Sequence, residues 1–187
     1  MEKPSKVFDA ILVLSAKSGD KKAIGLLAKR WHKKLCLHAY RYTNDWNLAQ
    51  DMAQDTWSTV IHKLHTLKDA NRFGSWILSI VTHRALDWLK KEKKQLQHLK
   101  NQYYKDKIIP EESEDLKEQQ IQQVLELLRE LPPDHKVVLT LFYLEKYSIK
   151  QISEITGVSV NTVKTRLFRA REKLKSVIKN KHDEKRY

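Results

Sequence analysis

Apolar residues recur at helical spacing along most of this chain. Over residues 20–42 they include Ile24, Leu27 and Trp31, which places them on one face of a helix. Comparable patterns cover three further stretches, 45–67, 72–94 and 118–178. Strand-like alternation is almost absent, and the chain has only four glycines and four prolines. The pattern predicts an all-α protein.

The helical pattern is interrupted over residues 95–117. This segment is polar, loses its apolar periodicity and ends in the acidic run 110–115, so it cannot bury enough surface to hold a fold. The interruption predicts two small helical domains joined by a flexible linker. The expected parts are an N-terminal extension of open role at 1–19, a first domain at 20–94, the linker at 95–117, a second domain at 118–180 and a charged tail at 181–187.

The second domain contains a helix-turn-helix pattern over residues 148–173. Ser148 precedes an apolar run and Gln151 follows three residues later, which is the signature of a capping box. Gly157 can adopt the positive φ that ends a helix, and Ser159 can cap the next one. The pattern therefore predicts a first helix, a tight turn and a second helix.

The second helix of this motif has a polar and basic outer face. Short polar side chains near its start can reach base edges in a major groove, and the cations further along suit phosphates. A solvated face on an ordinary helical hairpin is the alternative. The candidate DNA-binding residues are Asn161, Thr162, Lys164, Thr165, Arg166, Phe168, Arg169 and Arg171.

The net charge of +13 and the isoelectric point near 9.7 favour a polyanionic partner. Nucleic acid is the first candidate and a membrane surface the second. The sequence shows no apolar run near 18 residues and no signal-peptide pattern, so we expect a soluble cytoplasmic protein without membrane insertion.

The sequence offers little for covalent or metal chemistry. A single cysteine, Cys36, excludes an intrachain disulfide. Its pair with His32, and the pair His62 and His65, provide too few ligands for a tetrahedral metal site. There is also no Gly-rich phosphate loop and no nucleophile motif, so we expect no metal, no cofactor and no enzymatic activity.

An acidic and polar face on the helix predicted at 45–67 contrasts with the basic chain. Its residues are Asp51, Gln54, Asp55 and Ser58, opposite an apolar face of alanines, Val60 and Leu64. An acidic patch cannot serve DNA binding. It is either a docking surface for another partner or simply a solvated helix face.

Motifs in both halves resemble those of one protein family. Leu131-Pro132, Gly157, Thr162-Val163 and Arg169-Ala170-Arg171 resemble region 4 of bacterial sigma-70 factors of the extracytoplasmic function (ECF) class. Response-regulator output domains share a similar helix-turn-helix. The chain departs from the family pattern at Lys136, Asn161 and Thr165, so relatives do not define its promoter sequence.

The first half resembles sigma region 2. The run 51–57 is similar to region 2.2, and this resemblance implies that the acidic face docks on the β′ coiled coil of RNA polymerase. The run from Phe73 to Asp87 resembles regions 2.3 and 2.4, with His83 where the pattern usually has Asn and Lys90 in place of a frequent Arg. The residues that the resemblance implies for −10 contacts are Lys68, Asn71, His83, Arg84 and Lys91.

Together the two resemblances imply an ECF-type sigma factor. Such a protein binds core RNA polymerase through the β′ coiled coil and the β flap, recognises the −35 and −10 elements of promoter DNA and assists melting. The resemblance also implies an anti-sigma factor as partner, which is membrane-anchored for many relatives. The alternative is a free-standing helix-turn-helix regulator, which would leave the face at 51–57 without a role.

Overall fold

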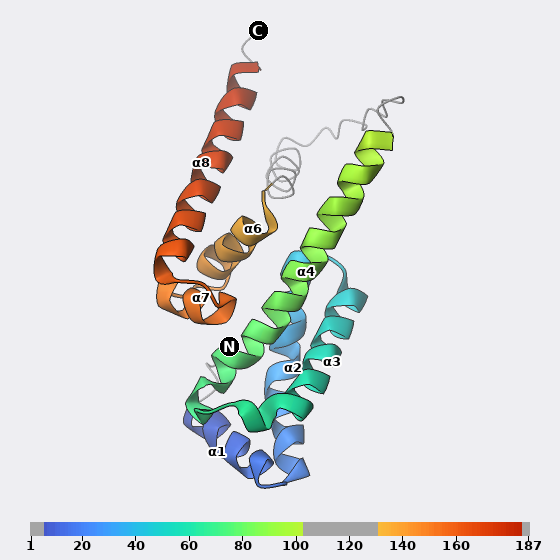
Figure 1. Cartoon of the computed structure of the whole chain (residues 1–187), viewed down its shortest axis with the longest axis vertical. Coiled ribbons are helices and arrows are strands. Elements are labelled where there is room, and N and C mark those ends of the chain that lie inside the picture. The colour runs from blue at the N-terminus through green and yellow to red at the C-terminus, as the bar shows by residue number, and fades with distance from the viewer. Residues whose placement is uncertain (1–5, 103–130, 185–187) are drawn as a thin grey trace.

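The computed structural model describes residues 6–102 and 131–184, with side chains over 6–96 and 131–176. Every regular element within these ranges is helical, which confirms the predicted all-α class. The first unit comprises α1 (Lys6–Lys17), α2 (Lys21–Thr43), α3 (Trp46–Lys63), the short turns η1 (Leu64–Thr66) and η2 (Ala70–Arg72), and α4 (Phe73–Gln102). The second unit comprises α6 (Pro133–Leu139), η3 (Thr140–Leu144), α7 (Ile149–Thr156) and α8 (Val160–Glu184). Figure 1 shows α4 and α8 as the two long helices.

Caps and turns encoded locally separate the helices of the first unit. The Asp20 carboxylate accepts from the backbone N–H of Lys22 at the start of α2. Asn44 takes the left-handed conformation, with φ 52°, and ends α2. The Asp45 side chain then accepts from the Leu48 N–H and begins α3.

The core of the first unit lies where α1, α2, α3 and α4 meet. Phe73 and Trp31 pack edge to face with their ring centroids 5.9 Å apart. Gly74 permits this contact, since a Cβ atom at that position would lie 2.8 Å from Cη2 of the Trp31 indole. Leu12 and Val13 of α1 are also buried, so the segment predicted as an extension packs against the first unit.

Helix α4 runs further than its apolar pattern indicated. It continues to Gln102, eight residues beyond the predicted end of the first domain at 94. The remainder of the predicted linker, 103–117, and the helix expected from 118 to 130 lie outside the described residues.

The helix-turn-helix of the second unit has the predicted geometry. Ser148 and Gln151 form the reciprocal capping box, in which each side chain accepts from the other residue's backbone N–H. Gly157 ends α7 with φ 70°, where a residue with a Cβ would be strained. The buried residues include Leu141, Ile152 and Val163. The predicted motif is confirmed.

The two units pack directly against each other. Helices α6 and α7 lie along α4 (Figure 1), and buried residues of both units belong to one continuous apolar cluster. The apolar patterns predicted two helical domains but contained no signal for this contact.

Candidate functional site

The N-terminal half of α8 presents most of the candidate −35 residues to solvent. The Ser159 hydroxyl accepts from the Thr162 N–H and caps the helix. Phe168 is 63% exposed, so its ring has little part in the core. The exposed members of the set are Asn161, Lys164, Thr165, Phe168, Arg169 and Arg171, whereas Thr162 and Arg166 are partly buried. The exposed residues form a polar and basic surface on one helix.

Two arginines of this set are oriented by groups of their own unit. A guanidinium nitrogen of Arg166 lies 3.6 Å from the Asp134 carboxylate. The guanidinium of Arg171 lies over the Tyr143 ring, 5.5 Å from its centroid. Burial lowers the pKa of the neighbouring His135, and the charge of Arg166 lowers it further. Both effects favour the neutral form of His135 beside α8.

The acidic face of α3 is exposed to solvent. Asp51, Gln54, Asp55 and Ser58 are all exposed, and the opposite side of the helix is buried through Ala49, Ala53, Trp57 and Val60. The structure thus brings these four predicted residues together on one surface.

Arg84 connects this acidic face with α4. One of its guanidinium nitrogens donates to the Asp55 carboxylate at 3.0 Å, and the other donates to the Thr59 hydroxyl at 2.9 Å. Arg84 was predicted among the −10 contacts, but here it lies beside the predicted docking face. Among the described residues of the −10 set, Arg84 is the one that forms an ion pair within the first unit, and its partner is Asp55.

The other predicted −10 residues occupy the turn before α4 and one side of that helix. Lys68 and Asn71 are exposed, and the Asn71 amide donates to the Asp69 carboxylate at 3.1 Å. On α4, Lys91 is exposed and Nδ1 of His83 lies 2.6 Å from the Ser79 carbonyl, to which it can donate. The turn and the helix therefore present cations and hydrogen-bonding groups without a competing core role.

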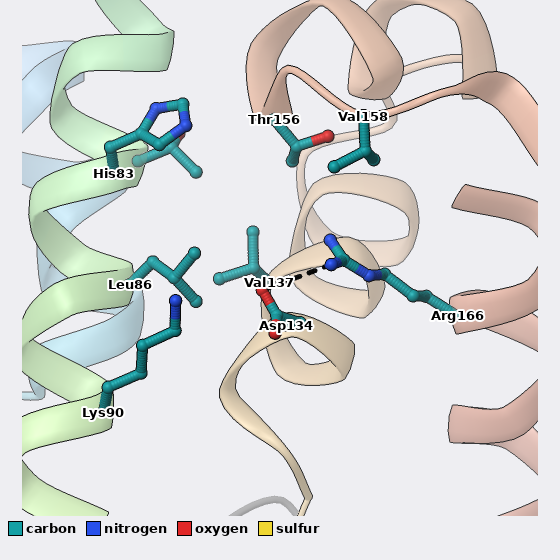
Figure 2. A pocket seen from close by; sticks show the side chains of 9 residues that line it. His83, Leu86, Lys90, Asp134, Val137, Thr156, Val158 and Arg166 are labelled. Atoms are coloured by element: carbon teal, nitrogen blue, oxygen red, sulfur yellow. Dashed lines mark ion pairs between the residues drawn. The ribbon is translucent and has the colours of Figure 1, made fainter. Parts of the chain in front are cut away.

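A pocket of about 220 Å³ lies between α4 and the second unit (Figure 2). Its lining residues are Thr82, His83, Leu86 and Lys90 from α4, and Asp134, Val137, Thr156, Val158 and Arg166 from the second unit. His83 of the predicted −10 set and Arg166 of the predicted −35 set thus line the same pocket.

The interface also contains residues that the motifs did not single out. Glu145, in the turn after η3, is only 5% exposed at its side chain and meets His38 and Arg41 of α2. Neither His38 nor Glu145 belongs to a motif that we could identify. Their only sequence signal is a polar residue in an otherwise apolar helical face at position 38.

The two residue pairs considered for a metal do not form a fuller ligand set. The thiol sulfur of Cys36 lies 3.6 Å from Nε2 of His32, and Nδ1 of His62 faces the Ser58 carbonyl at 2.7 Å. Among the described residues, no group of three or more His, Cys, Asp or Glu side chains gathers as a metal site would require.

Two models of sigma-70 regions match the sequence of this chain. Residues 27–95 match Sigma-70 region 2, and residues 121–174 match Sigma-70, region 4. The RNA polymerase sigma factor SigV of Bacillus subtilis is 31% identical over 71% of this chain and 76% of its own length. The ECF RNA polymerase sigma-E factor of Haemophilus influenzae is 28% identical over 91% of this chain and 95% of its own. The chain therefore belongs to the sigma-70 family.

Solved structures share the fold. The structure of CnrH in complex with the cytosolic domain of CnrY has a TM-score of 0.64 and 24% identity, covering 92% of this chain and 98% of that one. The sigma factor RpoE of Bartonella quintana, in complex with the anti-sigma factor NepR, has a TM-score of 0.58 and 19% identity, covering 84% of this chain and 98% of that one.

Within the sigma-70 family this chain is an ECF sigma factor. The ECF RNA polymerase sigma factor SigW of B. subtilis, 25% identical over 90% of this chain and 95% of its own length, belongs to the same group. The protein acts with RNA polymerase in transcription initiation and is not an enzyme. In the described ranges, no helix is long and apolar enough to cross a bilayer.

Proposed function

We propose that the outer face of α8 reads the −35 duplex. Asn161, Thr162 and Thr165 stand near the helix N-terminus, where short polar groups reach base edges in the major groove. Lys164, Arg169 and Arg171 follow on the exposed surface and suit phosphates. Phe168 supports this assignment because a largely exposed ring is suited to apolar contact with a thymine methyl group. Arg166 completes the set once its side chain turns from Asp134 to the DNA.

The turn before α4 and the exposed side of that helix serve the −10 element. Lys68 and Asn71 stand where an unstacked base could be held, and Lys91 suits the phosphates of a separated strand. His83 and Arg84 contribute contacts beside them. Separating base pairs costs a few kcal/mol per step, which captured bases and phosphate contacts offset.

The acidic face of α3 docks on core RNA polymerase. One observation carries this assignment: Asp51, Gln54, Asp55 and Ser58 are all exposed on one helix of a chain whose net charge is +13. Such a patch is unsuited to DNA and fits a basic protein surface, which we identify as the β′ coiled coil, while the second unit meets the β flap. We also propose an anti-sigma factor as a partner, one that is anchored in the membrane. The chain itself acts in the cytoplasm, beside the polymerase.

The test is co-purification with bacterial core RNA polymerase. We compare the wild type with Gln54→Ala plus Asp55→Lys, and with the matched control Gln95→Ala plus Asp87→Lys, whose positions are exposed on α4. The Asp55–Arg84 pair is at the surface, so its loss costs at most about 1 kcal/mol of folding free energy. Loss of the complex in the first variant alone supports docking. A wild type that ignores the polymerase yet binds duplex DNA overturns it in favour of a free regulator.

A further inference from the structure

The packed arrangement of the two units is incompatible with simultaneous binding of both promoter elements. On the proposed function, His83 serves the −10 element and Arg166 the −35 element. Positions −35 and −10 are about 25 base pairs apart, which is roughly 85 Å of duplex at about 3.4 Å per step. Yet both side chains line a single pocket of about 220 Å³ (Figure 2). The units must separate before the protein can engage both elements of one promoter.

A buried carboxylate contributes to holding the units together. Lys146 takes φ 59°, a left-handed conformation, in the turn that carries Glu145 against α2. An oxygen of Glu145 lies 2.7 Å from Nδ1 of His38 and 3.4 Å from a guanidinium nitrogen of Arg41. The contact with His38 has the distance of an ion pair but not the alignment of a hydrogen bond. We call these three residues the interdomain latch.

The groups around the latch position it and reinforce its charge balance. Nε2 of His38 lies 2.9 Å from the Thr82 hydroxyl of α4, which orients the imidazole. Burial lowers the pKa of Lys34, and the negative charge of nearby Glu145 raises it by a smaller amount. Glu145 therefore faces a pocket of α2 that is built from cationic and hydrogen-bonding groups.

A second ion pair joins the units at the other end of α7. A guanidinium nitrogen of Arg72 lies 3.0 Å from the Glu154 carboxylate, and Arg72 directly follows the turn proposed to hold a −10 base. This pair is more exposed than the latch, so it contributes less. The latch thus holds region 4 against α2, and the Arg72 pair holds it beside the turn that would meet the −10 element.

We propose that the chain is self-inhibiting, because the interdomain latch holds region 4 against α2 and α4 of region 2 in the free protein, so that the two units cannot span both promoter elements. The inhibitory consequence rests on the proposed function, whereas the closed state does not. Glu145 is buried only while the units are packed, since the latch partners of its side chain belong to the other unit. Replacing it therefore raises the free energy of the closed state and leaves the open state, where position 145 is solvated, unaffected.

The experiment is single-molecule energy transfer on the free full-length chain. Dyes are attached at Gln50→Cys and Ser176→Cys, both exposed, with the buried Cys36 replaced by alanine. We expect a dominant high-transfer population. Glu145→Lys should shift the closed-to-open ratio by at least about tenfold, or about 1.4 kcal/mol, toward low transfer. Glu172→Lys is the control, because its carboxylate pairs only with the exposed Lys175 among the ion pairs described.

A charge swap separates the latch from general damage. Adding Arg41→Glu to Glu145→Lys restores an opposite-charge pair and should return part of the high-transfer population. Helical circular dichroism checks that each variant is folded, and Glu154→Lys provides a second, smaller opening at the Arg72 pair. A wild type found only in low transfer, or a Glu145→Lys ratio equal to that of the control, overturns the proposal.

The inhibitory consequence has its own readout. Only the open protein can span both promoter elements, so the apparent affinity of the free chain for a promoter fragment that carries both should rise in Glu145→Lys by the factor by which the open fraction rises. Unchanged binding of this fragment by an opened variant overturns the self-inhibition. Because energy transfer is measured without polymerase or DNA, failure of the docking test in Gln54→Ala plus Asp55→Lys would leave the latch itself standing.

Discussion

Gly74→Ala tests how closely the first unit is packed at the start of α4. A Cβ atom there would lie 2.8 Å from Cη2 and 3.2 Å from Cζ2 of Trp31. The indole cannot easily move away, because its Nε1 donates to the buried Asp9 carboxylate at 3.2 Å and its ring packs on Phe73. The neighbour is therefore a fixed ring and not a flexible chain end.

The magnitude follows from two opposing terms. Overpacking a close-packed core costs about 1–3 kcal/mol. Replacing glycine by alanine in a helix gains up to about 1 kcal/mol, and less near a helix start. The expected net loss is thus about 1 kcal/mol of unfolding free energy, which lowers Tm by roughly 4–8 °C for a unit of this size.

Tryptophan fluorescence during urea unfolding measures this loss specifically. All five tryptophans lie in the first unit, so this probe reports mainly on the first unit. Gly25→Ala on α2 is the matched control, because nothing lies within 4 Å of its added Cβ, and it should stabilise by about 0.5–1 kcal/mol. If Gly74→Ala is as stabilising as Gly25→Ala, the indole yields without cost and the reasoning is refuted.

Three further predictions concern the second unit. Ser148→Ala removes half of the capping box and should destabilise this unit by about 1 kcal/mol, seen as earlier loss of helical circular dichroism, whereas Ser176→Ala should have little effect. Lys164→Gln should weaken binding to −35 duplexes of any sequence and reduce the slope of log K against log salt by about 1, while an unchanged slope would exclude a phosphate contact. The pKa of His135 is lower in the folded protein than in the unfolded chain, so the unfolded chain binds a proton at His135 first as pH falls below 6.5. The free energy of unfolding should therefore decline from pH 6.5 down through the folded-state pKa. His135→Gln should remove this part of the pH dependence, which urea unfolding at several pH values measures.

Much of the candidate site was predictable because its signals are local. The acidic face of α3 follows from helical spacing alone, and exposure of Asp51, Gln54, Asp55 and Ser58 agrees with it. The surroundings of the −10 set were less predictable from the sequence. Arg84 lies on α4 as expected, yet its guanidinium donates to Asp55 and Thr59 on α3. No pattern within one helix reveals a long side chain's partner on another helix.

The amino-acid sequence by itself determined the helices, their local caps and the order of the sigma regions. Caps such as Ser148 with Gln151, and the left-handed residues Asn44 and Gly157, act within a few residues of chain, so they are readable without the fold. Only the tertiary structure decided how the two units meet. Glu145 contacts His38, more than a hundred residues earlier in the chain. A contact between such distant positions depends on how the two units pack, which the periodicity of a single helix does not encode.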